Sequence, residues 1–303
     1  MLMKAVESYL AVRRAAGFKL EVVEVLLRSF VRYAEKVGEQ FVHAQTAIDW
    51  ARRSKSPEQK ARRLQMVIRL ARYLRAEDSR HEVPPEQDFG QRRRRPTPFI
   101  FEPVDIVRLI QQAQHLPSMD FLLPRSFSTL FALLVSTGLR ISEALALRFE
   151  DITDDGLVIR ETKFRKSRLV PLHDTAIAGL ERYLMFRQRC AASDDHLFVS
   201  RRGDALQYRY VRKIFRRLVQ AIGLEPHPGQ PRPQLHSFRH TFAVRALESC
   251  PDGRDRIAQH MLALSTYLGH ASVVETYWYL QATPQLMKDV SHAAESFVKG
   301  ERK

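Results

Sequence analysis

Three short segments after residue 136 carry residue types that could bind and attack a phosphate. In residues 137–143 (T-G-L-R-I-S-E), Arg140 lies between a glycine suited to end one helix and the first turn of the next. The free N–H groups of a helix start lie beside the guanidinium at such a position, which suits it to an anion. A surface arginine beside a helix cap would have the same pattern.

The second segment is residues 236–240 (H-S-F-R-H). Residues three and four apart share a helix face, so His236 lies alongside Arg239 or His240. A His/Arg pair can bind a phosphate and transfer a proton, because histidine titrates near neutrality. A metal site on His236 and His240 is the alternative, but the Glu of an H-E-x-x-H motif and a third ligand nearby are missing. A buried histidine with a satisfied hydrogen bond is also compatible.

The third segment, residues 267–270 (Y-L-G-H), precedes Tyr277 and Tyr279. Tyrosines at this spacing are often core residues, but beside the other two segments they indicate phosphoryl transfer through a tyrosine nucleophile. Two arginines could stabilise the charge on the phosphate oxygens, and Lys163 on a basic turn could protonate the leaving 5′-oxygen. No P-loop or metal-binding carboxylate cluster is visible, so we predict metal-free chemistry without a cofactor.

Apolar periodicity predicts the elements that must position these groups. Val22, Leu26, Phe30 and Tyr33 fall on one helix face, Ser56-Pro57 marks a helix start, and the chain is expected to be helical to about residue 86. Later segments predict a mainly α fold with a small β-sheet or hairpin (α+β). We expect helices at 103 onward, 126–137, 176–188, 207–222, 237–249, 255–268, 272–280 and after Pro284, a hairpin of 156–160 with 168–172, and a strand at 197–199.

A break in the pattern divides the chain. Residues 83–96 contain a proline pair and four consecutive arginines, which do not pack into a core. The sequence therefore predicts a helical domain over 1–88, a basic linker over 89–96 and a second domain over 97–303 that ends in a tail helix. A basic linker between two basic domains suits a clamp around a DNA duplex, although a solvated tether has the same composition.

Composition indicates a folded, basic protein. Lysine and arginine number 49 against 34 acidic residues, which gives a net charge of +15 and favours a nucleic-acid partner. Two cysteines exclude a disulfide framework. Neither a signal peptide nor an 18-residue apolar run is visible, so we expect a cytoplasmic, nucleoid-associated protein without a membrane partner.

Taken in order along the chain, these elements resemble the signature of the tyrosine recombinase (phage integrase) family. The match consists of T-G-L-R-x-S-E, a hairpin lysine, H-x-x-R, L-G-H and a tyrosine nine residues beyond that histidine. It covers residues 97–279 closely, and the helical N-terminal region resembles the family's core-binding domain more loosely. Lys163 lies eight residues before Pro171 and matches the hairpin lysine, with Lys166 as a nearby alternative. His236 and His270 are 34 residues apart, which exceeds the expected spacing, and we expect the extra length in a loop near 250–254.

The resemblance implies a role for each matched residue. Tyr279 would attack the DNA to form a 3′-phosphotyrosyl link, Arg140 and Arg239 would bind the phosphate, and Lys163 would act as general acid. His236 would assist proton transfer at Tyr279. The remaining matched residue, which would hydrogen-bond the phosphate, is His270. Tyr277 competes as nucleophile, but two residues span about 200° of a helix, and the spacing and T-x-x-Y context favour Tyr279.

The resemblance also implies partners. The expected substrate is double-stranded DNA with specific recombination sites, and strands would be exchanged through a Holliday junction without metal or ATP. The chain would be a monomer or dimer when free and a homo-tetramer on DNA, with the tail helix docked on a neighbouring subunit or packed in cis. Candidate DNA-binding residues lie on two basic helices: Arg209, Arg212, Lys213 and Arg216 on one, Arg62 and Arg69 on the other.

Two other functions remain compatible with the sequence. One is topoisomerase-IB-like strand relaxation with the same chemistry, and the other is a non-catalytic DNA-binding regulator on the same scaffold. The complete set of matched residues argues against the regulator. We see no arm-binding domain before residue 1 and therefore expect a compact recombinase that uses simple sites.

Overall fold

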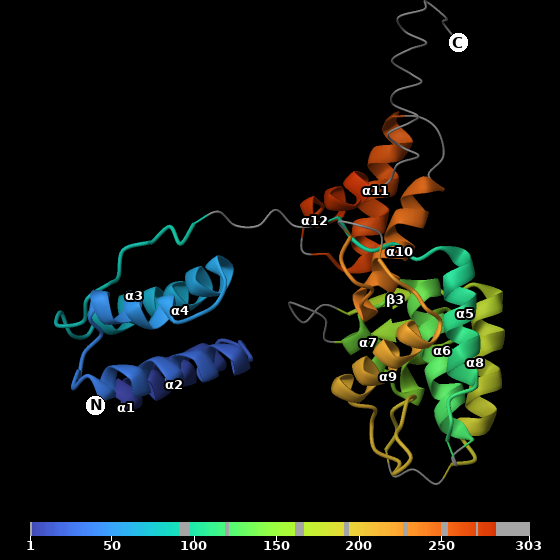
Figure 1. Cartoon of the computed structure of the whole chain (residues 1–303), viewed down its shortest axis with the longest axis horizontal. Helices are drawn as coiled ribbons and strands as arrows, with labels where there is room; N and C mark the ends of the chain where they lie inside the picture. Colours follow the sequence, from blue (N-terminus) through green and yellow to red (C-terminus); the bar gives the residue numbers. More distant parts are fainter. Residues whose placement is uncertain are drawn as a thin grey trace, which may run out of the picture. The chain divides into compact units, whose positions relative to one another are not determined.

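The computed structural model describes residues 2–90, 97–118, 121–160, 167–190, 194–226, 230–249, 254–270 and 272–282. The chain divides into two compact units, Met1–Arg95 and Pro96–Lys303 (Figure 1). Four predicted features lie wholly or mostly outside the described residues. These are the basic linker at 91–96, the hairpin turn with Lys163 and Lys166, the loop at 250–253 and the tail helix after Pro284.

The first unit is helical. Its helices are α1 (Leu2–Ala15), α2 (Glu21–Lys36), α3 (Ala44–Arg52) and α4 (Pro57–Arg75). The predicted start of α4 is confirmed, because the Ser56 side chain accepts a hydrogen bond of 3.2 Å from the Gln59 N–H. Fully buried Phe30, Leu70 and neighbouring apolar side chains form its core.

The prediction of helix to residue 86 is wrong beyond α4. Residues 76–90 contain no helix, and Pro84-Pro85, which lack backbone N–H donors, suit an extended path. The Glu82 N–H donates to the Val42 carbonyl at 2.8 Å, and the Val42 N–H donates to Nδ1 of buried His81 at 3.1 Å. Hydrogen bonds to the loop before α3 therefore replace helical ones here.

The second unit is mainly helical around a small sheet, which confirms the α+β fold class. Its α-helices are α5 (Pro103–Gln114), α6 (Leu122–Thr137), α7 (Ile141–Ala146), α8 (Asp174–Arg187), α9 (Tyr208–Ala221), α10 (Leu235–Glu248), α11 (Arg254–Leu268) and α12 (Val274–Tyr277). Two 3₁₀ helices are η1 (Phe149–Asp151) and η2 (Trp278–Ala282). The antiparallel sheet has the order β1 (Ile152–Thr153), β2 (Gly156–Ile159), β3 (Arg168–Val170).

The hairpin prediction is confirmed by pairing of Val158 in β2 with Leu169 in β3. The predicted strand at 197–199 is wrong, because the chain there makes only isolated bridges, one of them between Val199 and Ala205. Leu197, Phe198 and Val199 are each at most 1% exposed. The apolar run therefore reflects burial in the core, which periodicity alone cannot distinguish from a strand.

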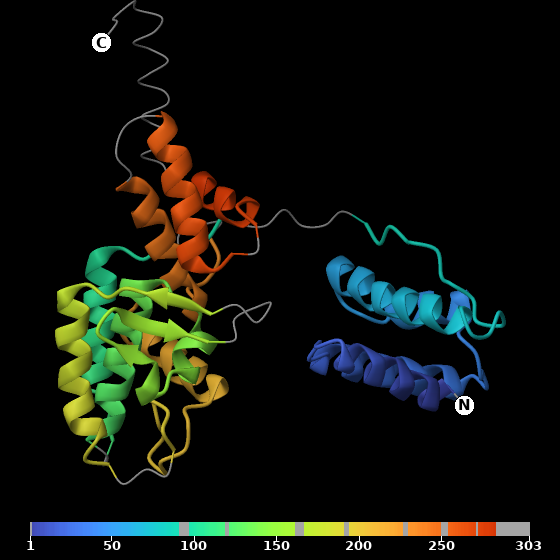
Figure 2. The same ribbon diagram turned by 180° about the vertical axis from the view of Figure 1, so that it is seen from behind.

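An aromatic core fixes α10, which carries two of the chemically interesting residues. Phe238 is fully buried and stacks on Phe101 at 4.9 Å and on Phe131 of α6 at 5.6 Å between ring centroids. Helices α10, α11 and α12 gather at one end of this unit, whereas α5, α6 and α8 lie side by side (Figures 1 and 2). The burial of Phe238 therefore determines where its helix neighbours His236 and Arg239 can point.

None of the helices described in either unit has the length and apolar character needed to cross a membrane.

We predict that Gly138→Ala destabilises the second unit more than Gly223→Ala does. Both glycines have positive φ, +61° and +65°, so each substitution carries the cost of a left-handed alanine, about 1–2 kcal/mol. A Cβ at Gly138 would lie 2.5 Å from Cδ1 of Phe242, whereas nothing lies within 4 Å of one at Gly223. The Phe242 ring is stacked on Tyr267, so we expect Gly138→Ala to cost a further ~1–3 kcal/mol. Urea denaturation measures both, and equal losses would contradict this packing.

Candidate active site

Arg239 is the most deeply buried charge of the site. It is 1% exposed, and its guanidinium donates to the carbonyl of Gly138 at 2.8 Å and to that of Leu268 at 2.6 Å. These carbonyls lie at the C-terminal ends of α6 and α11, where the partial negative charge of a helix stabilises a cation. Burial, together with the nearby charge of Arg140, lowers the pKa of Arg239 to about 10, so it remains protonated at neutral pH.

Arg140 reaches the same end of α11 from another direction. It lies between Gly138, whose left-handed conformation ends α6, and the first turn of α7, as the sequence predicted. Its guanidinium donates to the carbonyl of Gly269 at 3.0 Å and to that of Leu268 at 3.4 Å. Arg140 and Arg239 therefore share the Leu268 carbonyl, which brings two positive charges together.

Glu143 offsets part of this charge. One of its carboxylate oxygens accepts from the Arg140 guanidinium at 2.7 Å, and the other accepts from the Arg140 backbone N–H at 3.0 Å. Arg168 of β3 adds a bidentate pair to the same carboxylate, with distances of 3.1 and 2.8 Å. Burial alone would raise the pKa of Glu143, but the hydrogen bonds from Arg168 and Arg140 outweigh it and lower the pKa to about 2.

Arg168 was missed by the sequence analysis. Its position in the run R-L-V-P-L indicates a strand, and the pattern contains no sign that its side chain reaches the site. Besides Glu143, it binds the carbonyl of Tyr267 through Nε at 2.8 Å. A Cβ on Gly269 would lie 2.9 Å from this guanidinium, and Gly269 has φ +65°. The glycine of the L-G-H motif therefore both ends α11 and leaves room for Arg168.

His270 follows directly and is held by Thr276, with 2.7 Å between Nδ1 and Oγ1. Burial lowers the pKa of His270 to about 3, and the charges of Arg239 and Arg140 act in the same direction. The ring is therefore neutral at pH 7. Thr276 is fully buried, which fixes the ring relative to α12.

The two candidate tyrosines have opposite environments. Tyr279 is 2% exposed, its ring lies parallel to that of His270 at 6.2 Å, and its hydroxyl lies 3.2 Å from Nδ1 of His240. Tyr277 is 54% exposed. The predicted helix over 272–280 is divided into α12 and η2 between these two residues. The structure thus places Tyr279 beside His270 and His240 and close enough to Arg239 to interact with its charge, whereas Tyr277 lies at the surface.

Nδ1 of His240 lies 3.2 Å from the Tyr279 hydroxyl oxygen, a contact that the sequence did not predict. His236 lies one turn earlier on α10, and its ring meets that of His240 edge-on at 4.5 Å. The sequence predicts His240 only as a metal ligand in the alternative reading of the second segment. Its i, i+4 spacing from His236 was visible, but the approach of residue 279 depends on how η2 packs on α10.

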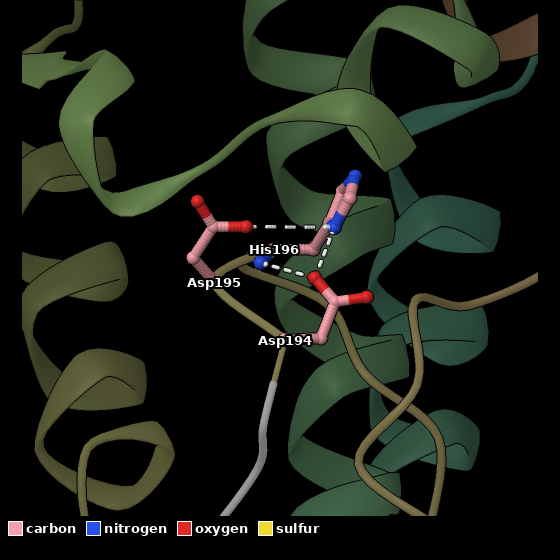
Figure 3. A group of neighbouring side chains, drawn as sticks. All are labelled: Asp194, Asp195 and His196. Atoms are coloured by element: carbon pink, nitrogen blue, oxygen red, sulfur yellow. Dashed lines mark hydrogen bonds and ion pairs between the residues drawn. The ribbon is translucent and has the colours of Figure 1, made fainter.

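A possible metal-binding group occurs elsewhere among the described residues. Asp194, Asp195 and His196 place three ligand atoms within 4.8 Å of one another, as Figure 3 shows. Asp194 already accepts from the His196 and Ala205 backbone N–H groups at 3.0 and 3.2 Å and contacts the His196 ring. Asp195 is paired with Arg148 at 2.9 Å. These contacts account for the cluster as a hydrogen-bonded turn.

The remaining predicted residues are Lys163 and six basic residues expected to bind DNA. Lys163 lies outside the described residues, between β2 and β3. One face of α9 is buried through Val211, Phe215 and neighbours, and four basic residues are exposed on the helix: Arg209, Arg212, Lys213 and Arg216. Arg62 and Arg69 are exposed on α4 in the first unit.

Comparison with known proteins identifies the family. Residues 101–285 match the model of the phage integrase family. The chain is 36% identical over 302 residues to "Putative integrase/recombinase y4rB" of Sinorhizobium fredii, with 96% of each chain covered. It is 30% identical over 237 residues to the tyrosine recombinase XerD of Caulobacter vibrioides, covering 76% of this chain and 73% of that protein.

Solved structures support the same fold. The Tn1549 transposon integrase in complex with transposon right end DNA superposes with a TM-score of 0.67 at 17% identity, covering 91% of this chain and 94% of that one. The chain therefore belongs to the phage integrase family, the tyrosine recombinases. It is an enzyme of DNA strand cleavage and rejoining.

We predict that Glu143→Gln lowers stability in a pH-dependent way. The pKa of Glu143 is about 2 in the folded chain against an ordinary value of 4.5. The lowered pKa of Glu143 contributes about 3 kcal/mol to the free energy of unfolding. This contribution is complete above about pH 4.5 and is lost as the pH falls toward 2. The difference in unfolding free energy between wild type and variant should be about 2 kcal/mol smaller at pH 3 than at pH 7.

Urea denaturation at the two pH values measures this difference. Glu102→Gln is the matched control, because its exposed pair with Arg245 should be worth less than about 1 kcal/mol. If Glu143→Gln lowered the free energy of unfolding by the same amount at both pH values, the carboxylate charge would not be what stabilises the group of Glu143, Arg140 and Arg168.

Proposed function

We propose that this chain is a site-specific DNA recombinase that cleaves and rejoins DNA through a 3′-phosphotyrosine at Tyr279. The observation that carries the proposal is the convergence of the buried Tyr279 hydroxyl, neutral His270 and two arginines at the C-terminal end of α11. The family supports this chemistry, and the DNA-bound integrases of the same fold support a duplex substrate.

In the proposed reaction the Tyr279 oxygen attacks the scissile phosphorus. The O–P bond to tyrosine forms, the bond to the 5′-oxygen breaks, and Lys163 supplies the proton that the leaving oxygen needs. Rejoining is the reverse, with the 5′-hydroxyl as nucleophile. The phosphotyrosyl link conserves the energy of the phosphodiester, so ATP is not required. The charge that a metal ion would stabilise is assigned to Arg140 and Arg239.

Arg140 and Arg239 stabilise the charge that develops on the non-bridging oxygens. A guanidinium has five N–H donors, and the bonds from Arg239 to the carbonyls of Gly138 and Leu268 use two of them. His270 contributes a further donor in the tautomer that carries its proton on Nε2, in which Nδ1 accepts from the Thr276 hydroxyl. These groups are held in place before the phosphate arrives, which limits the cost of reorganisation.

The wider assembly follows the same proposal. The first unit clamps the duplex with Arg62 and Arg69, α9 contacts the DNA backbone with its exposed basic residues, and four chains exchange strands between two sites through a Holliday junction. The +15 net charge supports a polyanionic partner of this size.

We predict that Tyr279→Phe abolishes a covalent protein–DNA adduct that Tyr277→Phe retains. The assay uses a nicked suicide duplex carrying a target site from DNA flanking the gene, with EDTA present, and scores SDS-resistant complexes on a gel. Tyr277 is the matched control because it lies two residues away and is 54% exposed.

The other outcomes distinguish the remaining functions. Loss of the adduct with Tyr277→Phe alone would reassign the nucleophile. DNA binding without any adduct would favour a non-catalytic regulator. Relaxation of supercoiled DNA without exchange between two sites would favour topoisomerase-like activity.

We further predict that Arg212→Ala and Lys213→Ala each weaken DNA binding, because each removes one phosphate contact. The slope of the logarithm of the DNA association constant against the logarithm of the salt concentration should become smaller by about 1 in each variant. Arg182→Ala, which removes an exposed arginine from α8, is the control and should leave the slope unchanged. Fluorescence anisotropy across a salt series measures the slopes. An equal change in all three variants would show that net charge, and not α9, determines binding.

A further inference from the structure

We propose that Arg168 is a positioning residue that shares the charge of Glu143 with Arg140 and so keeps the Arg140 guanidinium available to the scissile phosphate. The inference rests on the proposed function, in which Arg140 binds that phosphate. It gives a role in the reaction to an arginine that lies outside the motifs found in the sequence.

Glu143 is the group that connects the two arginines. Its Oε1 accepts from Nη1 of Arg140 at 2.7 Å and from Nη1 of Arg168 at 3.1 Å. Its Oε2 accepts from the Arg140 backbone N–H at 3.0 Å and from Nη2 of Arg168 at 2.8 Å. Each carboxylate oxygen is therefore shared between residue 140 and residue 168.

The carboxylate is charged and largely removed from water. The Glu143 side chain is 8% exposed. Burial opposes its charge, but the hydrogen bonds from Arg168 and Arg140 outweigh burial and lower the pKa of Glu143 to about 2. Because charges attract more strongly at a buried site than in water, a single guanidinium beside this carboxylate would be held closely by it.

Arg168 is held by contacts that do not involve Glu143. Its Nε donates to the carbonyl of Tyr267 at 2.8 Å, and as the first residue of β3 it lies opposite Ile159 of β2. A Cβ on Gly269 would lie 2.9 Å from its Nη1, so the guanidinium packs closely against the end of α11. Arg168 therefore presents a fixed pair of donors to the carboxylate.

Arg140 is the more accessible of the two arginines. Its side chain is 26% exposed, against 13% for Arg168. Its guanidinium also donates to the carbonyls of Leu268 and Gly269 at 3.4 and 3.0 Å. A carbonyl carries a partial charge and a carboxylate a full one, so Glu143 competes with the phosphate for Arg140 more strongly than these carbonyls do.

Removal of Arg168 would leave the whole charge of Glu143 to Arg140. Both carboxylate oxygens could then turn toward one guanidinium in a bidentate pair, which is the strongest geometry for these groups. The pair would offset the charge of Arg140 and move its donors away from the phosphate. A misplacement of about 1 Å can slow a reaction about 10²-fold.

The test compares two substrates in one preparation of each variant. The first is the nicked suicide duplex of the Tyr279 assay. The second carries a methylphosphonate at the scissile position, in which a methyl group replaces one non-bridging oxygen and removes the negative charge. Its cleavage depends less on nearby positive charge. The rate of adduct formation on the phosphodiester divided by that on the methylphosphonate, the charge preference, is independent of the fraction of folded protein.

We expect Arg168→Ala to lower the charge preference about 10²-fold. Arg148→Ala is the matched control, because it removes an arginine that is paired with exposed Asp195 at 2.9 Å in the same unit, and it should leave the charge preference within a few-fold of wild type. Addition of Glu143→Gln to Arg168→Ala should restore the charge preference about tenfold or more, because an uncharged amide no longer competes for Arg140.

Three results would overturn the inference while leaving the proposed function intact. An unchanged charge preference in Arg168→Ala, even with both rates lowered, would limit Arg168 to a role in the fold. A lowered charge preference that Glu143→Gln does not restore would mean that Arg168 does not act through Glu143. An equal decrease in Arg148→Ala would assign the effect to net charge. Absence of any adduct from the wild-type chain on both substrates would instead contradict the proposed function itself.

Discussion

Two like charges held at one helix end are the constraint on which the rest of this catalytic unit depends. Arg140 and Arg239 both donate to the Leu268 carbonyl, and their positive charges repel each other. The C-terminal carbonyls of α6 and α11 and the Glu143 carboxylate supply the compensating negative charge. A buried cation without such partners would be strongly destabilising.

This electrostatic requirement explains why distant segments meet. Arg239 ties α10 to the ends of α6 and α11, and Phe238 beside it is buried against α6, so apolar packing and charge pairing act on adjacent residues of one helix. Arg168 extends the network to the sheet through Glu143 and the carbonyl of Tyr267. The histidines and Tyr279 are then arranged around this hydrogen-bonded, charged centre.

The sequence could predict the parts of this arrangement that depend on local rules. Gly138 as a helix end and Arg140 at the next helix start follow from capping rules, and the motif spacing selected Tyr279 over Tyr277. It could not predict the partners of Glu143, because Arg168 reaches it from a strand 25 residues away. Nor could it predict the contact between His240 and Tyr279, which depends on the change from α12 to η2 between Tyr277 and Trp278. The failed strand at 197–199 has a related cause, since burial and strand pairing produce the same apolar run.

The most direct test of the account is to locate the DNA attachment in the chain by mass spectrometry. Trypsin should release residues 257–288 as one peptide that contains Tyr267, Tyr277 and Tyr279. After nuclease trimming of a trapped complex, fragmentation of this peptide should place a 3′-phosphate-linked nucleotide on Tyr279 alone. A nucleotide on Tyr267 or Tyr277, or on a residue outside this peptide, would contradict the claim that the arginine pair at the end of α11 presents the phosphate to Tyr279.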